Sequence, residues 1–281
     1  MANKSSRALR SPKPPRRGRR PARRILDLEE RPGVTRRVEI AIFVIACVLI
    51  MGFHVVLFCH SGAFWRDEIS TLYSAGAPDL GTMWHRLATD SAPMGYYVAL
   101  RMWIAAGLGG SDVDLRLFGS AISCGIVVSL CISCWMFTSR APLLAMSLVA
   151  FNGSIFYYCS SLRAYGLAVL LIMPCCAAFW RLSLRPSRWN ILASLVFALL
   201  SCHTSYANTY LLLAIGLAGA GTCAACRLWK RSALILGICF VTALSMLVYL
   251  PLILFFREGV QIAQSDVTMS LIGEVVVSTF A

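Results

Sequence analysis

Charged side chains are scarce in this chain: they make up 14% of its 281 residues, while 58% of the residues are hydrophobic. A soluble domain has about 25% charged and about 45–50% apolar residues. Acidic residues are the rarer kind, 13 against 26 basic ones. This lack of charge excludes an ordinary soluble protein and is typical of a chain that crosses a membrane several times.

The basic residues are unevenly distributed along the chain. Thirteen of the 26 lie within residues 1–37, among several prolines. Such a segment cannot bury a core, so we predict a disordered cytoplasmic tail that marks the topology and is attracted to anionic lipid. A nucleic-acid-binding arm is the less favoured alternative, and we expect no nucleic acid as a partner.

The twelve cysteines do not form the pattern of a small secreted protein, because nearly all of them lie inside apolar runs. Cys131 and Cys134, like Cys223 and Cys226, have the CxxC spacing, but each pair lies in or at the end of a predicted lipid-embedded helix. We therefore expect small packing residues, and we predict no metal site and no cofactor.

Long apolar runs predict about seven membrane-spanning helices, each near the length of about 20 residues that a bilayer requires. The expected spans are residues 40–59, 115–137, 141–159, 164–181, 189–205, 207–226 and 232–256. The predicted fold class is therefore an all-α transmembrane helical bundle. Residues 38–281 form its single membrane domain.

Residues 94–108 are apolar but short for a span, with Arg101 in the middle. They contain Tyr96, Tyr97 and Trp103, which are residue types that favour the membrane interface. We predict a helix lying on the membrane surface. The later basic clusters then share the cytoplasmic side with the tail, and residues 61–114 become an outer loop with short amphipathic surface helices.

The sequence Arg66-Asp67-Glu68 follows the first span directly. Charges kept near a membrane are often functional, and a carboxylate there suits a general base. Neighbouring residues on a helix point about 100° apart, so we expect one of the two to act, Asp67 rather than Glu68. The alternative is a helix cap at the membrane exit without chemistry.

Further candidates lie at the same predicted face. Asp90 precedes the surface helix, although capping alone explains it. Arg163 stands in a short turn, where its guanidinium either binds a phosphate or extends to the interface. His203 and Tyr206 end the fifth predicted span, and a lone histidine is more often satisfied locally than a metal ligand.

Four motifs share their order and spacing with a known family. They are Arg66-Asp67-Glu68, Asp90-Ser91-Ala92-Pro93 running into residues 96–103, Leu115-Arg116-Leu117, and Arg163-Ala164-Tyr165. Over about residues 60–210 the chain resembles the integral-membrane glycosyltransferases of the dolichyl-phosphate-mannose–protein mannosyltransferase type, which include the bacterial aminoarabinose transferase.

The chain departs from this family in two places. Ser91 and Ala92 replace a histidine and a proline, and Ser161 replaces a glutamate, which puts the acceptor type and even the activity in doubt. Members are also longer and often have a soluble C-terminal domain, so a truncated or split version of the family is an open alternative.

The resemblance implies a hexosyltransferase of the inner membrane of bacteria. It would transfer a sugar from a polyprenyl-phosphate donor to an acceptor at the outer face, with inversion. Asp67 or Glu68 would be the catalytic residue. The donor phosphate would meet Arg163, Arg66 and Arg257, and the pocket would contain Asp90, Tyr96, Tyr97, Tyr165, His203 and Tyr206. The alternatives are a transporter or lipid-carrier flippase, and a non-catalytic lipid-binding assembly subunit.

Overall fold

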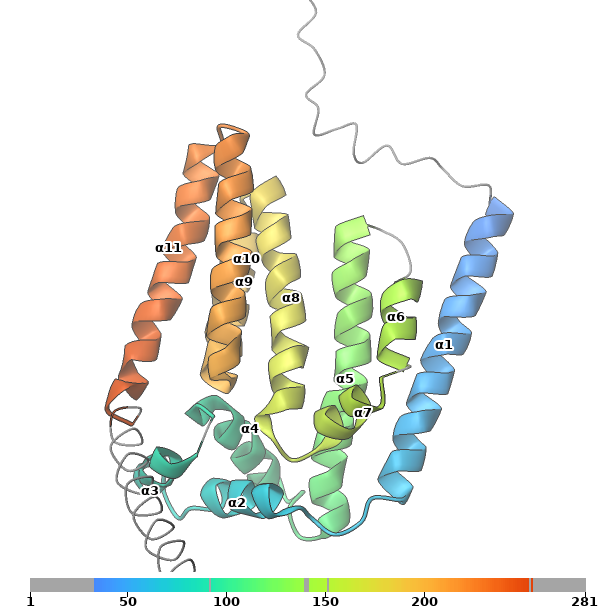
Figure 1. The fold of residues 1–281 in the computed structure, drawn as a ribbon, viewed down its shortest axis with the longest axis vertical. Coiled ribbons are helices and arrows are strands. Elements are labelled where there is room, and N and C mark those ends of the chain that lie inside the picture. Colours follow the sequence, from blue (N-terminus) through green and yellow to red (C-terminus); the bar gives the residue numbers. More distant parts are fainter. Residues whose placement is uncertain (1–32, 91, 139–141, 151, 253, 255–281) are drawn as a thin grey trace, which may run out of the picture.

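A computed structural model describes residues 33–90, 92–138, 142–150, 152–252 and 254. These residues are helical, with no strand among them (Figure 1). The α-helices are α1 (Gly33–Cys59), α2 (Arg66–Ala75), α3 (Leu80–Arg86), α4 (Met94–Ala105), α5 (Asp112–Thr138), α6 (Leu143–Ala150), α7 (Gly153–Ser160), α8 (Ala164–Leu184), α9 (Arg188–Thr204), α10 (Tyr206–Ala225) and α11 (Trp229–Met246). Single 3₁₀ turns follow α3 at Leu87–Thr89 and α11 at Leu247–Tyr249.

Five of the described helices are long and apolar enough to cross a membrane. They are Arg37–Cys59, α5, α8, α10 and the stretch Trp229–Leu252, and the pair α6–α7 makes a sixth if it is counted as one span. Helix α9 has 17 residues, or about 25 Å, which is short of the roughly 30 Å hydrocarbon core. The molecule is a helical membrane protein, and the predicted number of seven spans stays a prediction.

Within residues 141–159, which were predicted as one span, the structure has two helices, and whether the pair is one span stays a prediction. Helices α6 and α7 are bent by 73° relative to each other. Asn152 causes the break, because its side chain accepts a hydrogen bond from the Ile155 amide at 3.3 Å and so begins a new helix. Helix α6 runs beside α1 and α5, whereas α7 turns across one end of the bundle (Figure 1).

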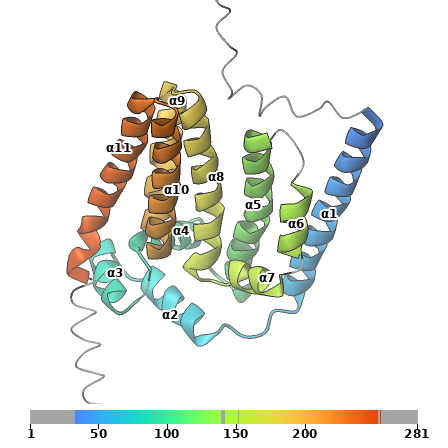
Figure 2. The same cartoon turned by 45° about the horizontal axis from the view of Figure 1, so that its top comes forward.

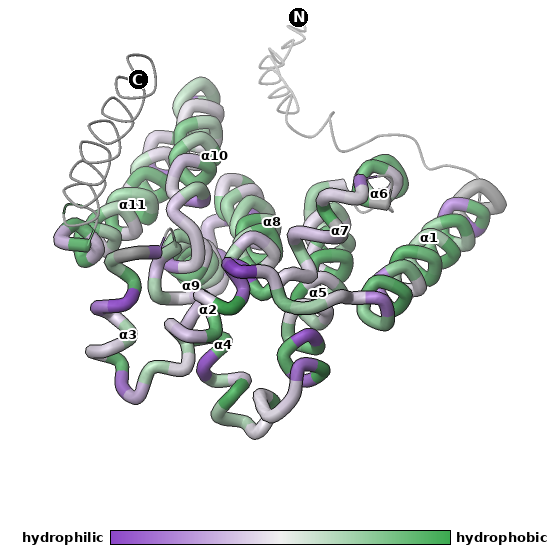
Figure 3. The backbone as a smooth tube through the Cα atoms, turned by 60° about the horizontal axis from the view of Figure 1, so that its bottom comes forward, coloured by the Kyte–Doolittle hydropathy of each residue, from purple (hydrophilic) through white to green (hydrophobic). Residues whose placement is uncertain are grey.

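Helices α2, α3, α4 and α7 gather at one end of the molecule (Figure 1). Seen from this end, the hydrophilic residues concentrate in α2–α4 and at the start of α5 (Figure 3). Every carboxylate that the structure describes beyond residue 40 lies between the end of α1 and the first turn of α5: Asp67, Glu68, Asp79, Asp90, Asp112 and Asp114. We call this end of the molecule the acidic end, and the side of the membrane that it faces stays a prediction.

Helix α4 packs inside the acidic end, with its two tyrosines buried. Tyr96 and Tyr97 are 0% and 1% exposed, so they face the protein interior, and the position of α4 at the membrane surface stays a prediction. The helix approaches α9 closely at Gly95, where an added Cβ would stand 2.4 Å from the carbonyl oxygen of His203. This backbone contact turns the two tyrosines into the interior, a constraint that the sequence of α4 alone does not contain.

Candidate functional site

Two glycines position the turn between α7 and α8. A Cβ on Gly119 of α5 would lie 2.0 Å from the carbonyl oxygen of Ser160, and one on Gly166 of α8 would lie 2.3 Å from that of Cys159. The last turn of α7 therefore fits between α5 and α8 only because both positions lack a side chain. The contact buries Leu162, which is 1% exposed, and fixes the residues that follow.

Glu68, in the first turn of α2, is fastened to this turn. Its Oε1 accepts a hydrogen bond from the Leu162 amide at 2.8 Å, and its Oε2 accepts one from the Trp65 amide at 2.9 Å. The second bond is one half of a capping box, while the first joins two segments 94 residues apart. Because the side chain is buried and both of its oxygens bind backbone amides, Glu68 connects α2 to the α7–α8 turn.

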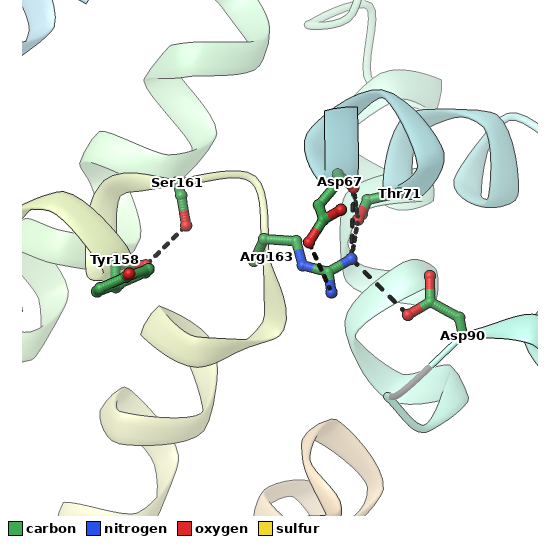
Figure 4. Close-up of polar contacts among 6 residues, drawn as sticks. All are labelled: Asp67, Thr71, Asp90, Tyr158, Ser161 and Arg163. Atoms are coloured by element: carbon green, nitrogen blue, oxygen red, sulfur yellow. Dashed lines mark hydrogen bonds and ion pairs between the residues drawn. The ribbon is translucent and has the colours of Figure 1, made fainter. Parts of the chain in front are cut away.

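Arg163, directly before α8, lies between two carboxylates (Figure 4). Its Nη2 stands 3.7 Å from Oδ2 of Asp67, and its Nη1 stands 3.7 Å from Oδ1 of Asp90. Nη1 also donates to Oγ1 of Thr71 at 3.2 Å and to the backbone oxygen of Asp67 at 3.3 Å. The side chains of Arg163 and Asp90 are 13% and 7% exposed, whereas that of Asp67 is 44% exposed, so Asp67 is the accessible member.

The arginine of this cluster and the two tyrosines beside it have shifted pKa values. Burial by itself lowers the pKa of Arg163, but the charge of Asp90, together with a hydrogen bond to Tyr165 and the nearby phenols, outweighs it, and the net pKa lies above its ordinary value. Burial also raises the pKa values of Tyr96 and Tyr97, and a hydrogen bond to the Asp90 carboxylate adds to the rise for Tyr97. The site therefore contains a fixed guanidinium and neutral phenols.

Two aromatic residues differ in how they complete the site. Tyr165 is 47% exposed and its ring centre lies 5.9 Å from the guanidinium carbon of Arg163, so it borders the accessible side. The hydroxyl of Tyr96 is buried and has no hydrogen-bond partner in the described part of the chain. Besides burial, the charge of Glu68 raises the pKa of Tyr96 and that of Arg163 lowers it, so this phenol lies beside the cluster.

The remaining predicted site residues lie elsewhere or are engaged differently. Arg66 is exposed at the start of α2 and forms no hydrogen bond or ion pair with the residues described. Arg257 lies outside the described residues. Ser161, at the position of the family's turn glutamate, donates a hydrogen bond to the backbone oxygen of Tyr158 at 2.8 Å (Figure 4).

His203 and Tyr206 belong to a second cluster, centred on Tyr249. The ring nitrogens of His203 are 2.9 Å from the Tyr249 hydroxyl and 3.0 Å from Oγ of Ser245, so both have local partners. The Tyr249 ring stacks on Trp84 with centres 5.5 Å apart and meets the Tyr206 ring edge-on. This cluster joins α3 to the ends of α9, α10 and α11. No pattern in the sequence distinguishes Tyr249 from other aromatic residues at helix ends.

Other arginines at the acidic end stabilise its irregular backbone. Arg86, Arg101 and Arg116 each donate to carbonyl oxygens of the segment between α1 and α3. Arg101 alone reaches the carbonyl groups of Ala77 and Pro78. Their guanidinium groups thus have structural partners, whereas that of Arg163 is directed at carboxylates.

No group of three His, Cys, Asp or Glu side chains within the described ranges is arranged to hold a metal ion. No family model, curated protein or solved structure matches the chain. The functional argument therefore depends on the motifs and on the geometry of the acidic cluster.

Proposed function

We propose that the protein transfers a sugar from a polyprenyl-phosphate donor to an acceptor hydroxyl, with Asp67 as the general base. The observation that carries the proposal is a 44% exposed carboxylate, ion-paired with a 13% exposed arginine, at the hydrophilic end of an apolar bundle. A donor carried by lipid arrives sideways from the bilayer, so its phosphate meets the protein at this level.

The chemistry is a single displacement. A carboxylate oxygen of Asp67 accepts the proton of the acceptor hydroxyl, the hydroxyl oxygen attacks the anomeric carbon, and the bond from that carbon to the phosphate oxygen breaks. Polyprenyl phosphate leaves and the configuration inverts. Base catalysis of this kind contributes roughly 10²–10⁴-fold. The ion pair with Arg163 keeps Asp67 oriented.

The donor phosphate has two candidate cations at the acidic end. Arg163 already faces Asp67 and Asp90, so a phosphate would have to share it with them or displace one of them. Arg66 is exposed at the start of α2, one residue from Asp67. We therefore assign the first contact with phosphate to Arg66 and the stabilisation of the leaving group to Arg163.

Glu68 has a different role in this proposal. Its two oxygens already accept backbone hydrogen bonds, and its side chain is buried. We assign it as a positioning residue for Asp67 and the α7–α8 turn, so the expected base is Asp67 alone.

The alternatives differ in how the geometry supports them. An ion-coupled transporter requires charged groups in mid-membrane, but in the described spans Asp, Glu, Lys and Arg occur only near helix ends. A non-catalytic lipid-binding subunit has one observation in its favour, which is that Arg163 is neutralised by two carboxylates. We keep it as the second candidate.

The orientation is part of the proposal. The loops opposite the acidic end contain Arg181, Arg185, Arg188, Arg227, Lys230 and Arg231. Because basic loops stay in the cytoplasm, we place the acidic end on the outer face of the inner membrane of a bacterium.

The test uses the parent protein and Asp67→Asn, purified in detergent, with release of polyprenyl phosphate from a labelled sugar donor as the measurement. We expect Asp67→Asn to lose roughly 10²–10⁴-fold in turnover. The matched control is Asp112→Asn, because Asp112 is exposed at the same end and outside the cluster. Equal turnover in Asp67→Asn and the parent would remove Asp67 as the base. Donor binding without turnover in the parent would favour the lipid-binding subunit.

A further inference from the structure

The end of the bundle opposite the acidic end has a concentrated set of exposed cations. They lie where α8 passes into α9 and where α10 passes into α11: Arg181, Arg185, Arg188, Arg227 and Lys230. None of these five forms an ion pair with any residue that the structure describes. We call this set the basic surface.

The two loops are joined to each other by Arg231. Its Nη1 donates to the carbonyl oxygens of Ser183 and Leu184, at 2.7 and 2.9 Å, and so satisfies the end of α8. The loops therefore lie side by side (Figures 1 and 2). Neither loop contains a carboxylate, and α1, the helix that contains Glu39, lies on the opposite side of the bundle from α10 and α11 (Figure 1). Among the residues that the structure describes, none forms an ion pair that neutralises the basic surface.

Arg227 occupies a backbone position that normally favours glycine. Its φ is 58°, in the left-handed region. It follows the end of α10, where the Leu228 amide donates to the Cys223 carbonyl oxygen at 2.8 Å in the pattern of a Schellman motif. Glycine adopts this conformation without strain. An arginine here places a guanidinium on the basic surface at a conformational cost.

Exposed tryptophans mark the depth of the basic surface in the membrane. Trp180, Trp189 and Trp229 are 40%, 66% and 67% exposed, near the same ends of α8, α9 and α11. The guanidinium carbon of Arg188 lies 5.5 Å from the ring centre of Trp189. Indole rings concentrate at the level of lipid headgroups, so cations beside them lie at the height of the lipid phosphates.

We propose that the basic surface binds the headgroups of anionic phospholipids. Three observations select lipid over other anions. The cations lie near exposed tryptophans, they stand at the ends of apolar helices, and Arg231 joins the two connections that contain them. A headgroup phosphate bound there has its acyl chains along α8 and α11. This inference is independent of the proposed glycosyl transfer.

The experiment measures lipid retained by the detergent-purified protein in native mass spectrometry, with phosphatidylglycerol and phosphatidylcholine added in separate arms. The test variant is Arg185→Gln/Arg188→Gln/Arg227→Gln/Lys230→Gln, which keeps Arg231 and the link between the loops. Each cation near an anionic surface contributes roughly fivefold to binding. We expect phosphatidylglycerol to bind the variant at least about tenfold more weakly, and the parent to prefer it over phosphatidylcholine.

Two controls separate charge from folding and position. Arg185→Lys/Arg188→Lys/Arg227→Lys keeps the charge and is expected to bind as the parent does. Arg86→Gln removes a cation at the opposite end, outside the proposed catalytic cluster, and is expected to leave phosphatidylglycerol binding unchanged. The proposal is overturned if the glutamine variant binds phosphatidylglycerol as the parent does, if both lipids bind equally, or if equimolar inorganic phosphate displaces the lipid.

Discussion

Replacing Glu68 by alanine tests the structural centre of the acidic end. The substitution removes both acceptor oxygens at once, the one bound to the Leu162 amide and the one bound to the Trp65 amide. Leu162 is 1% exposed, so its amide would be left buried without a partner. Trp65 is 48% exposed, so water can replace the lost acceptor there.

The two losses therefore differ in size. An orphaned buried amide costs about 1–3 kcal/mol, and a lost cap at an exposed helix start costs about 1 kcal/mol. We expect Glu68→Ala to lower the free energy of unfolding by about 2–4 kcal/mol. Glu68→Gln keeps one acceptor oxygen and should lose about half of that.

The assay is SDS-induced unfolding in mixed micelles, followed by tryptophan fluorescence, with turnover measured on the same samples. Asp67→Asn serves as the comparison, because its half-exposed ion pair contributes about 0–1 kcal/mol. A loss below about 1 kcal/mol in Glu68→Ala would refute the positioning role. Glu68→Gln with parental stability and no turnover would instead identify Glu68 as a catalytic residue.

Two further predictions concern packing and titration. Gly119→Ala places a Cβ 2.0 Å from the Ser160 carbonyl oxygen and should destabilise the protein by about 1–3 kcal/mol in the same unfolding assay, whereas Gly237→Ala, in α11 with nothing within 4 Å, should be neutral or stabilising by up to about 1 kcal/mol. Equal effects of the two would contradict the close approach of α7 and α5. Burial raises the pKa of Tyr96, so this phenol loses its proton in the unfolded chain first, near pH 10. The contribution of Tyr96 to the free energy of unfolding is therefore fully present below about pH 10 and decreases as pH rises. Tyr96→Phe should flatten the alkaline loss of stability and, by removing a buried hydroxyl without a described partner, raise the free energy of unfolding by about 1 kcal/mol at pH 7; an unchanged alkaline profile would be inconsistent with a buried phenol.

The sequence predicted the helical membrane class because long apolar runs have few other solutions. It also predicted Asp67, Asp90 and Arg163 at one end, since each of them adjoins an apolar run or the surface helix on the same predicted side. The break at Asn152 had a local signal, an Asn-Gly pair inside an apolar run, which favours a helix start over a helix interior.

Other features had no local signal. The bond from Glu68 to the Leu162 amide joins residues 94 positions apart, and a sequence pattern does not determine which backbone amide a carboxylate will meet. The burial of Tyr96 and Tyr97 depends on the close contact of Gly95 with α9. Both are products of tertiary packing, which the local sequence does not contain.

The separation of Asp67 and Arg163 by 96 positions has a consequence for biosynthesis. A ribosome adds about 5–20 residues per second, so a nascent chain holds the acidic segment for roughly 5–20 s before its arginine is made. Burying the carboxylates during that interval would leave charge uncompensated. We therefore expect α2–α4 to dock late, after α8 has delivered the cation.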